Sequence, residues 1–200
     1  MRSAGRPCKK EHGTALNKAM ELFWDKGYEG AAVSDLVEKT GLQPGSLYGS
    51  FKNKENLFLE SIRLYGERAV AEAKKALHSG SSPESGIESF FDDIVKGQSS
   101  GSQKRGCFLV KTVIENSSTN SRLHKLACHY LDVIEDEIYL CLKKVKSFSP
   151  AQAKQIAKIL ICNVWGLRVL QASGAPVESV RAVARQMLTS AWATRSSESC

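Results

Sequence analysis

Cysteine and histidine side chains are the first candidates in this chain for reactive or metal-binding groups. Cys107 follows the cations Lys104 and Arg105 at the expected start of a helix, and both surroundings favour the reactive thiolate form. His124 and Cys128 are spaced i, i+4 on one helix face, but two ligands are too few for a tetrahedral metal site. We therefore expect no metal and no other cofactor.

A second group of residues is suited to binding rather than catalysis. The short segment 43–50 carries small and polar side chains that fit the major groove of DNA, where each base pair displays its own pattern of donors and acceptors: Gln43, Ser46, Tyr48 and Ser50. Lys52 and Lys54 follow at once, where a phosphate backbone would pass, and Lys54 lies at a helix start whose amides can bind phosphate.

Composition narrows the function classes. The chain has 200 residues and a formal net charge of +7, which favours polyanionic partners such as nucleic acid or an anionic membrane surface. No GxSxG, HExxH, Walker A or GxGxxG pattern occurs, so we do not expect an enzyme. No stretch reaches the roughly 18–20 apolar residues of a membrane span, and no signal peptide opens the chain, so a cytoplasmic protein is expected.

Helical periodicity runs through almost the whole chain, and strand signals are weak. The pattern predicts an all-α protein of about nine helices. Their expected ranges are 11–26, 33–40, 44–51, 54–78, 84–96, 107–116, 121–145, 150–172 and 177–194. The second and third are short and are separated by Gly41, so residues 33–51 have the form of a helix-turn-helix. An ordinary three-helix subdomain would show the same spacing.

Five segments of the first 60 residues together resemble the TetR family of transcriptional regulators. They are GRP at 5–7, ALNKAMELFWDKGYEG at 15–30, VSDLVEKTG at 33–41, GSLYGSF at 45–51 and KENLF at 54–58. The resemblance implies a DNA-binding role for Arg6, Ser34, Gln43, Pro44, Gly45, Ser46, Tyr48, Gly49, Lys52 and Lys54, with residues 1–10 as a basic arm. It further implies an N-terminal helix-turn-helix domain over residues 1–53, an effector-binding and dimerisation domain over 54–194, and a tail over 195–200.

Two positions depart from the family pattern. Ala31 and Ala32 stand where the family usually has a threonine that caps the second helix and binds phosphate, and loss of a cap costs roughly 0.5–2 kcal/mol unless another group substitutes. Gly49 and Ser50 stand where an aromatic residue or histidine is common. The operator sequence therefore stays open.

The resemblance assigns dimerisation to the last two helices. Their apolar stripes are the expected interface, with packing inside one subunit as the alternative: Ile156, Leu160, Val164, Leu167, Val180, Met187 and Leu188. A dimer would place two recognition helices about 34 Å apart on a palindrome.

The expected switch lies in the middle helices. The run RGCFLVKTVIE at 105–115 resembles a TetR subgroup in which a cysteine at this place sometimes senses electrophiles, although a structural thiol is the favoured interpretation for Cys107. The other candidates for an effector site are Phe90, Phe91, Phe108, Ile114, Tyr130 and Trp165.

The sequence thus predicts a DNA-binding regulator, and repression is the default sign that the resemblance implies. Its partners would be double-stranded operator DNA, a second copy of itself and a small apolar or electrophilic effector, and it would lie at the nucleoid when bound. Effector binding or thiol modification would release it from a palindromic operator. The alternatives are an activator of the same family, or a membrane-surface or ligand-binding helical protein without a DNA role.

Overall fold

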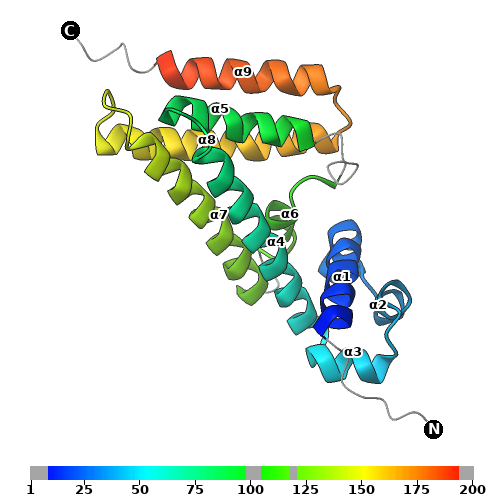
Figure 1. The fold of residues 1–200 in the computed structure, drawn as a ribbon. Helices are drawn as coiled ribbons and strands as arrows, with labels where there is room; N and C mark the ends of the chain where they lie inside the picture. Colours follow the sequence, from blue (N-terminus) through cyan, green and yellow to red (C-terminus); the bar gives the residue numbers. More distant parts are fainter. Residues whose placement is uncertain (1–8, 98–104, 118–120, 194–200) are drawn as a thin grey trace. The chain divides into compact units, whose positions relative to one another are not determined.

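The computed structural model describes residues 9–97, 105–117 and 121–193, and within these ranges it contains nine helices and no strand (Figure 1). The helices are α1 (Lys9–Gly30), α2 (Val33–Thr40), α3 (Pro44–Phe51), α4 (Lys54–Leu77), α5 (Pro83–Lys96), α6 (Phe108–Glu115), α7 (Ser121–Leu142), α8 (Pro150–Ala172) and α9 (Val177–Ala193). The all-α prediction is confirmed. The predicted helix ends agree closely except that α1 continues to Gly30 and α7 ends at Leu142.

The extension of α1 has a local cause. Gly27, the predicted end of the helix, has a non-helical backbone with φ 73° and ψ 179°. Glycine adopts positive φ without the clash that a Cβ would cause. The chain therefore breaks where the sequence indicated, and one further short turn follows before α2.

The chain forms two compact units. The first contains residues 1–67 and 108–129, and the second contains residues 68–107 and 130–200. Helices α4 and α7 each contribute to both units. The start of α4, all of α6 and the start of α7 thus belong to the same unit as the helix-turn-helix, although two of these segments are distant from it in sequence.

Aromatic packing holds the first unit together. Phe23, Phe58 and Phe108 are fully buried, and the Phe58 ring lies 4.7 Å from Phe23 and 5.4 Å from Phe108, centroid to centroid. Trp24 and Tyr65 extend the cluster through edge contacts. Helix α1 packs against α2 and α6, and α2 packs against α3. One apolar cluster thus anchors both the helix-turn-helix and α6.

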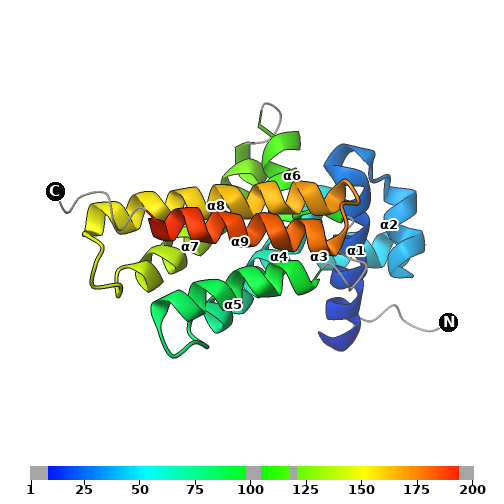
Figure 2. The ribbon, with the colours of Figure 1, turned by 90° about the horizontal axis from the view of Figure 1, so that it is seen from above.

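The second unit is built on α8 and α9, which run side by side, with α5 along α9 (Figures 1 and 2). Helices α5 and α8 each begin with a serine N-cap followed by proline, Ser82 and Ser149. The buried Gln171 side chain of α8 donates to the carbonyl of Ile94 at the end of α5, over 2.8 Å. A buried amide needs such a partner, so this bond fixes the pairing of the two helices.

Most of the residues predicted for the dimer interface fall on the inner side of these helices. Ile156, Leu160, Val164, Leu167 and Val180 are buried within a single protomer. Met187 and Leu188 are half-buried. The apolar stripes of α8 and α9 thus contribute to the core of one protomer, and their part in a dimer stays a prediction.

A different face of α8 and α9 carries exposed apolar side chains. Ile159, Val169 and Val183 are large hydrophobic residues left open to solvent, and Cys162 is also exposed. Among the described residues, no helix is long and apolar enough to span a bilayer.

Candidate nucleic-acid interface

The turn between α2 and α3 is fixed by short-range hydrogen bonds. Gly41 ends α2 in the left-handed conformation with φ 76°, and its amide donates to the Val37 carbonyl over 2.9 Å. The Thr40 hydroxyl donates to Leu36 and accepts from the Leu42 amide. These bonds set the direction in which α3 leaves the turn.

Helix α3 has one buried and one open side. Leu47 and Phe51 are buried and attach the helix to the first unit. The open side consists of the residues predicted to meet DNA: Gln43, Pro44, Gly45, Tyr48 and Gly49 are exposed, and Ser46 is half-buried. The structure therefore brings these six together on the solvent face of one short helix.

The two glycines of α3 are not required by the fold. A Cβ built on Gly45 or Gly49 would meet nothing within 4 Å, and neither residue has a positive φ. Because glycine has no side chain, these two residues leave the backbone of α3 accessible on its exposed side. Glycine serves this purpose where another molecule must approach the main chain closely.

The segment after α3 holds the two predicted phosphate ligands. Lys52 is exposed and has a positive φ of 68°, and its amide donates to the Tyr48 carbonyl over 2.7 Å. The Lys54 ammonium lies 4.8 Å from the centre of the Tyr28 ring, a cation–π contact that holds this lysine at the start of α4. The pKa of Tyr28 is raised by burial and by Glu55 and Glu29, so the phenol stays neutral.

The start of α2 uses an unexpected cap. Ala32 has no side-chain acceptor, and the Asp35 carboxylate instead accepts from the Ala32 amide over 3.2 Å. Lys26 of α1 donates to the same carboxylate over 2.7 Å. The hydrogen bond from Lys26, followed by the one from Ala32, lowers the pKa of Asp35. Ser34, to which the family resemblance assigned a DNA-binding role, is exposed beside this cap.

The basic arm lies outside the described residues. Arg6 falls before the first described residue, and the side chains of Lys9 and Lys10 are likewise not described.

Comparison with known proteins identifies the chain. Residues 15–61 match the family of bacterial regulatory proteins called tetR. Over 188 residues the chain is 30% identical to the HTH-type transcriptional repressor ComR of Escherichia coli (strain K12), covering 92% of this chain and 90% of that protein. The chain belongs to the TetR family. It is a DNA-binding transcriptional regulator.

Solved structures of TetR proteins share the fold. A TetR-family regulator from Cytophaga hutchinsonii superposes with a TM-score of 0.82 at 20% identity, covering 94% of this chain and 97% of that chain. A cysteine mutant of the TetR regulator CifR, complexed with a 26-base-pair operator DNA, gives a TM-score of 0.76 at 22% identity, with 94% and 98% coverage. The predicted architecture of an N-terminal helix-turn-helix and a helical C-terminal part is confirmed.

In this TetR-family chain the predicted effector residues are distributed over both units. Phe108 belongs to the aromatic cluster of the first unit, whereas Phe90, Phe91, Tyr130 and Trp165 lie in the second. Ile114 is 69% exposed on α6, so it lines no enclosed pocket in this structure. Cys107 directly precedes α6 and is half-buried.

Trp165 has an unusual environment. Its indole Nε1 is buried, and no described residue accepts its hydrogen bond. A buried donor without an acceptor costs free energy, and a ligand that carries an acceptor would recover it.

The His124 side chain is engaged at both ring nitrogens. Its Nε2 lies 3.5 Å from Cys128 Sγ and its Nδ1 lies 3.3 Å from the Val113 carbonyl. Among the described residues, no group of three or more metal-binding side chains occurs. The pair therefore serves in the structure as a link between α7 and α6.

Sequence reasoning missed two residues that shape the interface. Asp35 accepts the Ala32 amide, which is one of the two bonds of a capping box, and an acidic residue three positions after a helix start was a usable signal. Asn53 accepts from the Asn56 amide over 2.8 Å and thereby caps α4, directly beside Lys52 and Lys54. An asparagine just before an apolar helical run is typical of an N-cap.

Proposed function

We propose that this TetR-family protein is a repressor that binds a palindromic operator as a homodimer and is released by an effector. The observation that carries the proposal is the open face of α3. Buried Leu47 and Phe51 attach α3 to the first unit and leave its polar and glycine residues exposed. Lys52 and Lys54 follow α3 directly. A helix of this kind fits the major groove, and the adjacent lysines meet phosphates.

The proposed dimer uses the exposed apolar side chains of α8 and α9. Ile159, Val169 and Val183 support this assignment because large hydrophobic residues are normally covered in a stable assembly. A twofold dimer would present two copies of α3 to successive major grooves.

Release would start from the surroundings of Trp165 or from Cys107. The buried Trp165 Nε1 favours an effector that carries a hydrogen-bond acceptor. Cys107 is the alternative trigger, because it directly precedes α6 and α6 packs against α1 of the DNA-binding unit. An effector shifts this equilibrium only as far as it binds one conformation more tightly than the other.

The test begins with an operator selected from random DNA. Binding is followed by fluorescence anisotropy as a function of salt, and a reporter gene placed behind the operator gives the sign of regulation. We expect a palindromic site, a steep loss of affinity with rising salt and a reporter that is silenced. Failure to select any operator would overturn the proposal, and an activated reporter would replace repression with activation.

The thiol branch is tested on the same complex. N-ethylmaleimide is added to the wild type and to Cys107→Ser, and release of DNA is measured. Release from the wild type alone would assign the switch to Cys107. If both proteins stay bound, the thiol is structural and the effector is a small molecule of the second unit.

A further inference from the structure

Helix α6 presents one face to α1. Phe108, Lys111, Thr112 and Glu115 recur at i, i+3, i+4 and i+7, which places them on one side of the helix. Phe108 and Thr112 are buried, whereas Ile114 on another side is exposed. Because α6 and α1 are in contact, this face forms the junction between them.

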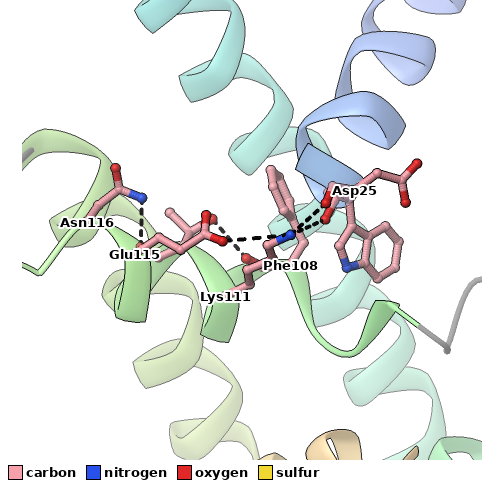
Figure 3. Close-up of polar contacts among 7 residues, drawn as sticks. Asp25, Phe108, Lys111, Glu115 and Asn116 are labelled. Carbon is pink, nitrogen blue, oxygen red and sulfur yellow. Dashed lines mark hydrogen bonds and ion pairs between the residues drawn. The ribbon is translucent and has the colours of Figure 1, made fainter. Parts of the chain in front are cut away.

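Lys111 binds the last regular turn of α1. Its ammonium donates to the Trp24 carbonyl over 2.8 Å and to the Asp25 carbonyl over 2.9 Å (Figure 3). These carbonyls lie just before the break at Gly27. A cation at this end of a helix satisfies backbone acceptors and complements the negative pole of the helix dipole.

Glu115 closes the junction from the other side. Its carboxylate lies 3.7 Å from the Lys111 ammonium, one helical turn away. The Glu115 carboxylate also lies against Gly27, since a Cβ built on Gly27 would meet Glu115 Oε2 at 2.5 Å, and the positive φ of Gly27 itself favours glycine there. Two segments that are distant in sequence, the end of α1 and one face of α6, therefore meet closely at this point.

The polar contacts continue from this junction to the helix-turn-helix. Lys26 follows Asp25 directly and binds Asp35, and Asp35 caps α2 through the Ala32 amide. Lys111 of α6 thus holds the end of α1 at Asp25. The next residue, Lys26, stabilises the start of α2 through Asp35.

We infer that Lys111 is a positioning residue that fixes the helix-turn-helix to α6 by capping α1. The inference rests on the proposed operator binding. Any displacement of α6 relative to α1 must break the two hydrogen bonds of Lys111, which lose strength steeply with distance and angle. The Lys111 cap therefore makes the orientation of the DNA-binding helices depend on the position of α6.

The test measures how strictly the dimer requires one half-site spacing. Operators in which the two halves are moved apart by one or two base pairs are compared with the selected operator, for the wild type and for Lys111→Met. We expect Lys111→Met to reduce the preference for the selected spacing by roughly 2- to 30-fold, the range of a coupling residue. A purely structural defect would lower the affinity for all spacings alike.

Matched variants separate the cap from loss of charge. Lys125→Met removes one exposed lysine of α7 in the same unit and should keep the wild-type spacing preference. Lys111→Arg retains donors and should recover much of it, whereas Glu115→Gln should give a smaller loss. An unchanged preference in Lys111→Met, or an equal loss in Lys125→Met, would overturn the inference.

Hydrogen exchange on the free full-length protein gives a second readout that needs no operator. Lys111→Met should speed amide exchange at the end of α1 and in α2, and Lys125→Met should not. Equal exchange in the two variants would refute the cap. Absence of operator binding by the wild type would instead refute the proposed function.

Discussion

Helices α5 and α8 of the second unit start in a different way from α2 of the first unit. In the second unit, α5 and α8 carry their own start signals: Ser82 and Ser149 accept hydrogen bonds from amides three residues later, and each is followed by proline. In the first unit, α2 starts at Ala32, which has no capping side chain. Its cap is assembled from Asp35 and from Lys26 of another helix.

This difference indicates which helix starts can respond to changes elsewhere in the protein. A helix with a local cap keeps its start whatever its neighbours do, because the stabilising bonds lie within four residues. A helix whose start depends on α1, which itself is capped from α6, responds to changes in those elements. The DNA-binding unit thus contains two helix ends, the start of α2 and the end of α1, that receive a side chain from another helix.

The largest effect on stability is expected when the apolar anchor of α6, Phe108, is removed. Phe108→Ala deletes a ring that is 1% exposed and contacts Trp24, Phe58 and Tyr65. We expect a loss of about 3–5 kcal/mol in the free energy of unfolding, since both burial and packing are lost. Urea denaturation followed by tryptophan fluorescence measures it.

The control lies on the same helix. Ile114→Ala removes a side chain that is largely in solvent and should change the free energy of unfolding by less than about 0.5 kcal/mol. A similar loss in both variants would mean that α6 tolerates truncation equally on every side, which contradicts the described junction.

A second test separates stability from function within the DNA-binding unit. Gly49→Ala should raise the free energy of unfolding by up to about 1 kcal/mol, because alanine favours a helix and the added Cβ meets nothing. The same Cβ would intrude on DNA that approaches α3, so operator affinity should fall. Anisotropy and urea denaturation of one preparation measure both quantities.

Gly13→Ala is the matched variant for that test. Gly13 lies in α1, and a Cβ there also meets nothing within 4 Å. It should give a comparable gain in stability without loss of operator affinity. If Gly49→Ala binds the operator as tightly as the wild type, α3 does not approach DNA at this position.

The sequence predicted the local features of the fold well, because the signals for them act over short distances along the chain. Apolar periodicity, Gly41 and the Ser149-Pro150 start each act over a few residues, so the helix ranges and the helix-turn-helix could be read directly. The exposed face of α3 followed from the same periodicity, because burial of Leu47 and Phe51 leaves its other residues outside.

Contacts between distant segments could not be read in this way. The stripes of α8 and α9 indicate burial but not whether the same chain or a partner covers the side chains; in the structure, Leu160 and Val180 are buried within one chain. Nothing local in Lys111 indicates that it meets α1 more than 80 positions away, since many helices carry a lysine and a glutamate four residues apart.

The smallest expected effect is the pH dependence of stability at the start of α2, which should be absent at the serine-capped start of α8. The lowered pKa of Asp35 means that its ionised form is favoured in the folded protein, so its contribution to stability is complete above the unfolded pKa near 4 and is lost as pH falls through the lower folded value. Asp35→Asn should therefore be less stable than the wild type between about pH 7 and pH 5, and the gap should close below about pH 4.

Ser149→Ala provides the contrast, because serine does not titrate in this range. It should cost roughly 0.5–2 kcal/mol at every pH in a series of urea denaturations. A gap between wild type and Asp35→Asn that stays constant down to about pH 3 would show that the carboxylate charge does not hold α2. The start of α2 would then be as local as that of α8, and the contrast between the two units would rest on α6 alone.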